Sequence, residues 1–339
     1  MPSEHTASID TTDTLKGVAI SAVLMNHYMN LNISADWSGF AYQWVSVFFL
    51  LSGYGLFYSF EKRFHETITV KKLFTYYYGR LVRIFPLLWI AWFIQFIISR
   101  GDISYWIPLG INASGHYWFI PALLQCYLLS PLLYWSMKKN VTLTATLILI
   151  VFIVTNILFI GGYVPHIFMR LAKITNSKWM EMYFFHIIIF TGGLLIPTFL
   201  SAKKPADTVA KQEFHSASFW VFTLFIIAVF ALLKYFSQIS PFFRRELFIL
   251  PLIMIIMLSG YALRYSIHNS LFKLLGRMSY SLYLFHMSYY LLVSNLGGFP
   301  ENSLTELLVV AVLFPVFIFL CRHIEQYGNF FAKRLKSFV

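Results

Sequence analysis

Long apolar segments recur along the whole chain, separated by short polar stretches that carry the cations. Of the 339 residues, 58% are hydrophobic and only 12% are charged, which is too little polar surface for a soluble protein of this size. About ten segments are long enough to cross a bilayer as helices. They lie near 15–32, 40–60, 84–99, 117–136, 141–160, 180–200, 217–237, 246–263, 279–296 and 303–321. The sequence therefore predicts an all-α, polytopic transmembrane helical bundle of about ten spans.

The distribution of cations predicts how this bundle is oriented. Lys and Arg are retained on the cytoplasmic side of membrane proteins. With the N-terminus in the cytoplasm, 19 of the 26 Lys and Arg residues fall on inner loops and tails and 7 on the outer side. We therefore expect both termini in the cytoplasm of a multi-pass protein of the cell membrane. The same bias accounts for the net charge of +12, so no nucleic-acid partner is expected.

No stretch of the chain reads as a separate soluble domain. The longest hydrophilic stretches are 61–83 and 201–216. We expect one integral-membrane domain over residues 1–339, with a polar N-terminal tail at 1–12 and a basic cytoplasmic C-terminal tail at 322–339.

Lys16 and His27 are the first residues that suggest chemistry. They are eleven residues apart, which on a helix corresponds to three turns plus ~20° and a rise of ~16 Å. Both side chains would share one face, with the cation at a membrane surface and the imidazole near mid-depth. An ionisable group inside a bilayer is costly and is a functional hypothesis by default. The alternatives are an interfacial Lys16 that snorkels and a packed His27 bonded to a backbone carbonyl.

Arg80 and Arg83 lie three residues apart, before the third apolar segment. On a helix their guanidinium groups would share a face. Guanidinium groups suit phosphate oxygens, and neighbouring cations raise the local concentration of anions. The alternative is ordinary positive charge at the inner membrane surface.

Two further groups combine polar and aromatic residues. Ser52 and Tyr54 follow a pair of phenylalanines and offer hydroxyls beside glycines that permit close helix packing. His116 and Trp118 open the fourth segment from the outer side and suit hydrogen bonding to a sugar and stacking on it. Helix packing is the alternative for the first group, and an aromatic interfacial belt for the second.

The ninth apolar segment contains a second intramembrane histidine, His286, three residues after Tyr283 and on the same helix face. A third, His186, ranks below these two. The cysteines, Cys126 and Cys321, show neither a disulfide framework nor zinc-ligand spacing, and no metal is expected.

Taken together and in this order, these motifs resemble those of the acyltransferase family 3 membrane proteins. The resemblance covers residues 10 to about 290 and agrees with the ten spans of that family. The motifs that carry it are Lys16-x10-His27, Phe48-Phe49-x-x-Ser52-Gly53-Tyr54, Arg80-x-x-Arg83-x-x-Pro86 and Ser279-Tyr-Ser-Leu-Tyr-Leu-Phe-His286.

The chain departs from the family pattern at two places. The family usually has Arg where Lys16 stands, and Lys keeps the charge but loses the bidentate fork. Many members have paired acids where this chain has Leu123 and Leu124, so any role of those carboxylates is absent here.

The resemblance implies an O-acyltransferase that moves an acyl group, most often acetyl, from cytoplasmic acetyl-CoA or another acyl-CoA to a hydroxyl of a surface polysaccharide or lipid-linked glycan. It implies His27 as general base or acyl carrier, and Lys16, Arg80 and Arg83 as contacts to coenzyme A phosphates. Residues that would orient the sugar or stabilise the oxyanion are Ser52, Tyr54, His116, Trp118, Tyr283 and His286. Proteins of glycan synthesis or export are possible partners. The competing interpretations are a transporter or flippase of lipid-linked sugars and a non-catalytic subunit of a polysaccharide synthase.

Overall fold

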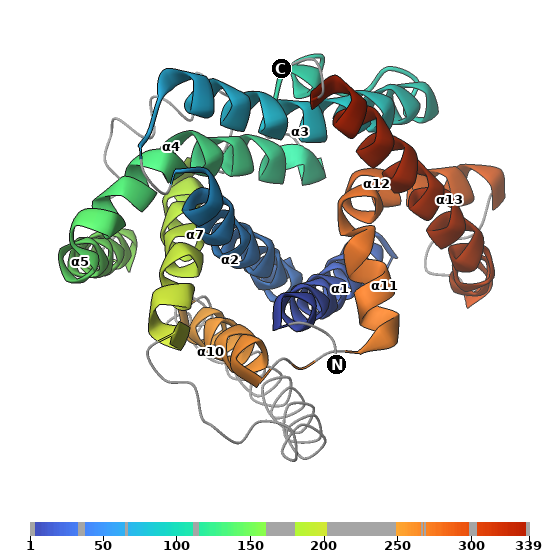
Figure 1. Cartoon of the computed structure of the whole chain (residues 1–339). Coiled ribbons are helices and arrows are strands. Elements are labelled where there is room, and N and C mark those ends of the chain that lie inside the picture. Colours follow the sequence, from blue (N-terminus) through green and yellow to red (C-terminus); the bar gives the residue numbers. More distant parts are fainter. Residues whose placement is uncertain are drawn as a thin grey trace. The chain divides into compact units, whose positions relative to one another are not determined.

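The computed structural model describes residues 4–32, 38–64, 67–110, 115–160, 180–201, 249–265, 267, 269–297 and 304–336 (Figure 1). Within these ranges every regular element is a helix, which confirms the predicted all-α class. The chain forms two compact units. The first comprises Met1–Gly55 and Ile189–Ser279, and the second comprises Leu56–Ile188 and Tyr280–Val339.

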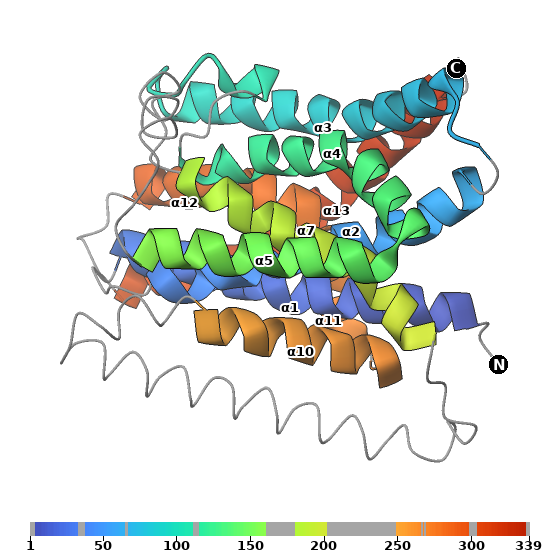
Figure 2. The same ribbon diagram turned by 90° about the vertical axis from the view of Figure 1, so that its left-hand side faces the viewer.

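The first unit is assembled around the N-terminal helix. Its elements are α1 (Glu4–Asn32), the first part of α2 (Ser38–Arg63), the second part of α7 (Met180–Ser201), α10 (Ile249–Tyr265) and α11 (Ser270–Arg277). Helices α10 and α11 both contact α1 (Figure 2). Helices α2 and α7 cross closely through glycines: a Cβ added at Gly53 would lie 2.0 Å from the carbonyl oxygen of Phe190. Small residues permit such close approach of helices in a membrane.

Two glycines also set the distance between α1 and α11. A Cβ at Gly17 would lie 1.8 Å from the carbonyl oxygen of Phe272, and a Cβ at Gly276 would lie 1.7 Å from that of Asp13. The start of α11 is fixed by Asn269, whose side-chain oxygen accepts hydrogen bonds from the backbone N–H groups of the first turn. The short helix α11 is therefore held backbone to backbone against α1.

The second unit contains the remaining parts of α2 and α7. Its other elements are α3 (Val70–Ile98), the 3-10 helices η1 (Ile107–Leu109) and η2 (Gly115–Trp118), α4 (Phe119–Lys139), α5 (Val141–Ile160), α12 (Ser279–Gly297) and α13 (Leu304–Lys336). Helix α3 packs against both α4 and α13 (Figure 1).

A buried carboxylate fixes the start of α12 in this unit. Glu325 of α13 is 8% exposed and accepts hydrogen bonds from both the backbone N–H and the hydroxyl of Ser281. The hydroxyl of Tyr280 donates to the carbonyl oxygen of Ile84 on α3, at 2.9 Å. A carboxylate at a helix N-terminus satisfies unpaired N–H groups and suits the helix dipole.

Helix α3 begins much earlier than the sequence predicts. Residues 70–83 are helical, whereas the sequence analysis assigns them to a polar stretch before a short span at 84–99. The side chain of Thr69 caps the helix by accepting a hydrogen bond from the N–H of Lys72. The 29 residues of α3 correspond to ~43 Å, which exceeds the ~30 Å hydrocarbon core of a bilayer. Hydropathy locates only the apolar part of such a helix, which explains the difference.

Three stretches among the described residues are long and apolar enough to cross a membrane. They are Val70–Ile98, Gly115–Lys139 and Leu307–Lys336. The predicted segment at 217–237 lies outside the described residues, and the count of ten spans and the side of each terminus stay predictions. Where they are described, the predicted tails are helical, because α1 begins at Glu4 and α13 continues to Lys336.

We predict that Gly17→Ala lowers the melting temperature of the detergent-solubilised protein by several degrees. The added methyl group would meet the Phe272 carbonyl, so α1 and α11 would have to separate, at a cost of about 1–3 kcal/mol. The matched control is Gly55→Ala in α2, where an added Cβ meets no atom within 4 Å. Equal melting temperatures for the two variants, measured by intrinsic fluorescence, would contradict the packing described.

Candidate active site

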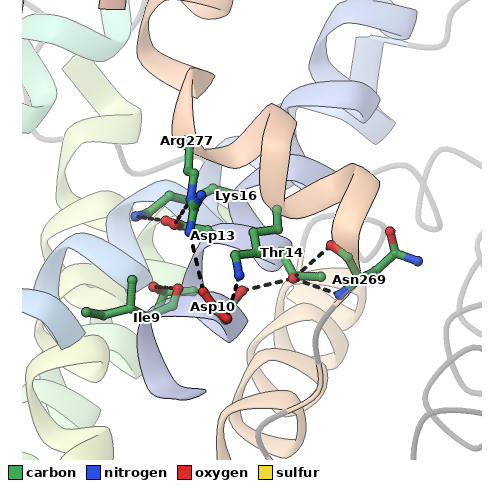
Figure 3. A network of polar contacts seen from close by, with 9 residues as sticks. Ile9, Asp10, Asp13, Thr14, Lys16, Asn269 and Arg277 are labelled. Atoms are coloured by element: carbon green, nitrogen blue, oxygen red, sulfur yellow. Dashed lines mark hydrogen bonds and ion pairs between the residues drawn. The ribbon is translucent and has the colours of Figure 1, made fainter. Parts of the chain in front are cut away.

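Lys16 lies in a network of charges that joins α1 to α11 (Figure 3). Its ammonium group is 3.3 Å from a carboxylate oxygen of Asp13, and the other oxygen of Asp13 lies 3.3 Å from Nε of Arg277. Asp10 pairs with the same Arg277 at 3.6 Å and with Lys273 at 2.5 Å. Lys16 therefore has an internal counter-charge, which an anionic ligand would have to share or displace.

A neutral hydrogen bond adds to this network. The hydroxyl of Thr14 donates to the backbone oxygen of Asp10 and accepts from the backbone N–H of Asn269 at 3.0 Å. Since Asn269 caps α11, Thr14 connects the cap of one helix to the backbone of the other (Figure 3). Thr14 is 1% exposed, so the bond is shielded from water.

His27 lies eleven residues beyond Lys16 on the same uninterrupted helix, as the spacing requires. Its side chain is half-buried, and the preceding Asn26 is buried. Ser52 and Tyr54 lie in the part of α2 that belongs to the same unit; Tyr54 is buried and Ser52 is half-buried. The first unit thus contains Lys16, His27, Ser52 and Tyr54 of the predicted site residues.

Four predicted residues come together in the second unit. The rings of His116 and His286 have centroids 5.0 Å apart and are inclined by 73°. The hydroxyl of Tyr283 donates to the carbonyl oxygen of His116, and Phe119 packs on the Tyr283 ring at 5.1 Å. Trp118 follows in the same turn. We call His116, Trp118, Tyr283 and His286, together with His186, the histidine cluster.

The geometry of His286 fixes which ring nitrogen carries a proton. Its Nδ1 lies 2.7 Å from the carbonyl oxygen of Tyr283, and a carbonyl can only accept a hydrogen bond. Nδ1 is therefore the donor, and Nε2 carries the lone pair when the ring is neutral. Such a ring, 0% exposed, can accept a proton or a hydrogen bond at Nε2.

His186 belongs to this cluster, although the sequence ranks it last. Its ring stacks on Trp118 with centroids 5.1 Å apart and an angle of 29°. His186 is 2% exposed and Trp118 is 5% exposed. One face of Trp118 is thus covered by an imidazole. The stacking of Trp118 on a sugar stays a prediction. No local pattern connects positions 118 and 186, so only the tertiary structure reveals the contact.

Arg80 is held between two aromatic rings of the second unit. Its guanidinium carbon lies 5.4 Å from the ring centroid of Tyr76 and 5.2 Å from that of Tyr127. The Tyr76 hydroxyl is fixed in turn by the hydroxyl of Ser130 at 2.7 Å. Arginine stacks well on aromatic faces while its N–H donors remain available at the edge. Arg83, one turn further along α3, is exposed.

Two more cations lie near this pair, and sequence reasoning assigned neither of them a role. The charge of Arg80 acts on Arg63 at the end of α2, and the charges of Arg63, Arg80 and Arg83 act on Lys336 at the end of α13. We call Arg63, Arg80, Arg83 and Lys336 the basic cluster. Its members come from α2, α3 and α13, so a local motif could only find the pair on α3.

Among the described residues, no group of three or more His, Cys, Asp or Glu side chains is arranged to hold a metal ion. The side chains described above offer imidazole, hydroxyl and guanidinium groups. Imidazole serves as an acid or base near neutral pH, and guanidinium groups bind anions.

Comparison with known proteins agrees with the class of protein that these features define. Long apolar helices with outward-facing large side chains, such as Val312 and Phe319 of α13, characterise an integral membrane protein. A family model described as an acyltransferase domain matches residues 9–322, nearly the whole chain. The chain therefore belongs to this family of membrane acyltransferases, which confirms the resemblance found from the motifs. No curated protein and no solved structure matches the chain.

We predict that Asp13→Asn destabilises the first unit by about 1 kcal/mol, because Lys16 and Arg277 would lose a shared counter-charge. The effect should show as a lower melting temperature at low ionic strength, and the difference from wild type should shrink in high salt, where ion pairs are screened. Asp102→Asn, at an exposed position, is the control. A salt-independent difference would contradict the ionic character of the network.

Proposed function

We propose that this protein is a membrane O-acyltransferase that moves an acyl group, most often acetyl, from cytoplasmic acyl-CoA to a hydroxyl of a surface polysaccharide or lipid-linked glycan. Membership of the acyltransferase family supports the reaction class. The observation that carries the donor assignment is the basic cluster, in which Arg80 and Arg83 are joined by two further cations. Coenzyme A is a ligand with several phosphates, and grouped guanidinium groups suit it.

The positions of charged helix ends support a cytoplasmic donor site. In the second unit, Glu61 near the end of α2 pairs with Lys138 near the end of α4 at 2.5 Å. The hydroxyl of Tyr78, early in α3, lies 3.4 Å from the carbonyl oxygen of Leu335 at the end of α13. These are the ends that the cation bias assigns to the cytoplasm, where acyl-CoA is available.

The chemistry that we propose is a direct acyl transfer. The acceptor hydroxyl oxygen attacks the thioester carbon while a histidine takes the hydroxyl proton. The C–S bond then breaks, and the coenzyme A thiolate leaves and takes up the proton, so that an ester and free coenzyme A are formed. We assign the base to His27. A variant of this route passes the acyl group through an acyl-histidine before the hydroxyl attacks.

The histidine cluster supplies buried donors and acceptors for the same reaction class. We propose that His116, Tyr283 and His286 orient the sugar or stabilise the oxyanion. Buried, preorganised donors are effective at this task because water does not compete with them. The close contact of His116 with His286, and the fixed tautomer of His286, support a polar role for the cluster.

The proposal is tested with membranes from cells that express the chain and from cells that lack it. Acetyl-CoA labelled in the acetyl group should transfer its label to a glycan only with the first membranes. The presence of O-acetyl groups on the surface glycan, compared between the two cell types, gives a second readout. If no label leaves the donor but the export of glycan depends on the chain, the protein is a transporter and the proposal is wrong.

We predict that His27→Ala reduces acyl transfer by at least about 100-fold, because the loss of a general base removes this much of the rate. Expression and membrane insertion should be normal, as judged by immunoblotting of the membrane fraction. The control is His323→Ala, which removes an exposed histidine of α13. Turnover by His27→Ala at the wild-type rate would remove His27 from the mechanism.

We predict that the double substitution of Arg80→Ala and Arg83→Ala raises the KM for acyl-CoA by tenfold or more, because each charge-assisted contact to phosphate is worth about 1.5–3 kcal/mol. The KM for the acceptor should change little. Lys71→Ala and Lys72→Ala together, on the first turn of the same helix, are the control. An unchanged KM for acyl-CoA would rule out a phosphate role of the pair.

A further inference from the structure

The end of helix α13 lies on the part of α3 that precedes Arg80. An added Cβ at Gly79 would lie 3.3 Å from Cε of Lys336, so the lysine chain runs over this glycine. The Tyr78 hydroxyl donates to the carbonyl oxygen of Leu335, which anchors the last turn of α13 there. Further along, Gly328 packs on Leu87. Lys336 is exposed, and its aliphatic chain lies over Gly79 at the point where α13 packs on α3.

The end of α2, which carries Arg63, packs on α3 and α4 through an aromatic cluster. Phe60, one turn earlier on α2, packs on Tyr76 of α3 at 5.0 Å and on Tyr134 of α4 at 5.1 Å. Tyr76 is the ring on which Arg80 stacks. The end of α2, and with it Arg63, is thus fixed against the segment that carries Arg80.

Within the part of the chain that the structure describes, no acid forms an ion pair with any of the four cations. Among the described residues of the second unit, Lys138 forms an ion pair with Glu61. No described carboxylate lies within ion-pair distance of a cation of the basic cluster. Glu61, the acid close in sequence to Arg63, also accepts a hydrogen bond from Tyr134 at 3.0 Å. Grouping like charges is unfavourable unless an anion lies between them.

Arg63 shows this lack of a counter-charge most directly. Its Nη1 is buried and makes no hydrogen bond among the described residues. Burial and the neighbouring Arg80 charge both lower the pKa of Arg63. A buried guanidinium nitrogen without an acceptor costs free energy, and an anionic oxygen is the group that would relieve it.

We propose that Arg63 and Lys336 complete, with Arg80 and Arg83, one binding site for a ligand that carries several phosphate groups. This inference rests on the proposed function in taking that ligand to be the coenzyme A part of the donor. Coenzyme A carries a phosphomonoester and a diphosphate, about four negative charges in all, which four cations match. Lys336 lies at the end of α13, beyond residues 9–322, the part that matches the family.

The test is equilibrium binding of tritiated coenzyme A to the full-length protein in phosphatidylcholine nanodiscs. We expect Arg63→Gln and Lys336→Gln each to raise the Kd by about 3- to 10-fold, with the number of binding sites unchanged and a weaker dependence on salt. A purely structural role would instead lower the number of sites. Arg322→Gln is the matched control, because it removes an exposed cation of α13 that lies ~21 Å along the helix from Lys336.

Three other outcomes have separate meanings. If both variants bind coenzyme A like the wild type, this inference is overturned and the proposed function stands. If the wild type binds no coenzyme A, the donor assignment of the proposed function fails. Binding of inorganic pyrophosphate then tests the basic cluster alone. If both variants bind pyrophosphate as tightly as the wild type, this inference is overturned. If the substitutions weaken only the association of phosphatidylglycerol, added to the nanodiscs, the phosphates are those of lipid headgroups, and the assignment to a nucleotide is wrong.

Discussion

The cost of placing an unpaired charge in an apolar medium governs how this chain is arranged. A segment that crosses the hydrocarbon core must satisfy its own backbone groups, so it is a helix, and its charges are confined to its ends. In the described residues those ends carry the ion pairs: Asp10 and Asp13 with Lys273 and Arg277 in one unit, and Glu61 with Lys138 in the other. Polar side chains that are buried deep within a unit are therefore exceptions to this arrangement.

The buried imidazoles are such an exception. His116, His186 and His286 are each at most 5% exposed and are packed among aromatic rings. The ring of His286 donates a hydrogen bond to the backbone carbonyl of Tyr283. An imidazole held in this way stays neutral at little cost and keeps a definite tautomer. This property suits acid–base work in a site from which water is excluded.

Much of the fold follows from local sequence, because apolar length and helix propensity act over one segment at a time. The predicted limits of 141–160 and 180–200 agree closely with α5 and α7. The polar first half of α3 was missed because hydropathy reports the apolar part of a helix alone. Contacts such as Lys336 with Gly79, or Trp118 with His186, join positions far apart in the chain and have no local signature. Pairs on one helix, such as Arg80 with Arg83, could be predicted from their spacing. The residues that other helices place beside them could not.

The two groups of cations differ in the field that they project. Around Lys16, three cations share two carboxylates at close range, so most of the charge is neutralised within a few ångströms. Around Arg80, the fields of four cations reinforce one another, and no described acid is bonded to them. Uncompensated charge of one sign attracts counter-ions over about a Debye length and accelerates the encounter with them. Since no described carboxylate pairs with the basic cluster, its charge would raise the rate at which an anion arrives as well as the affinity for that anion.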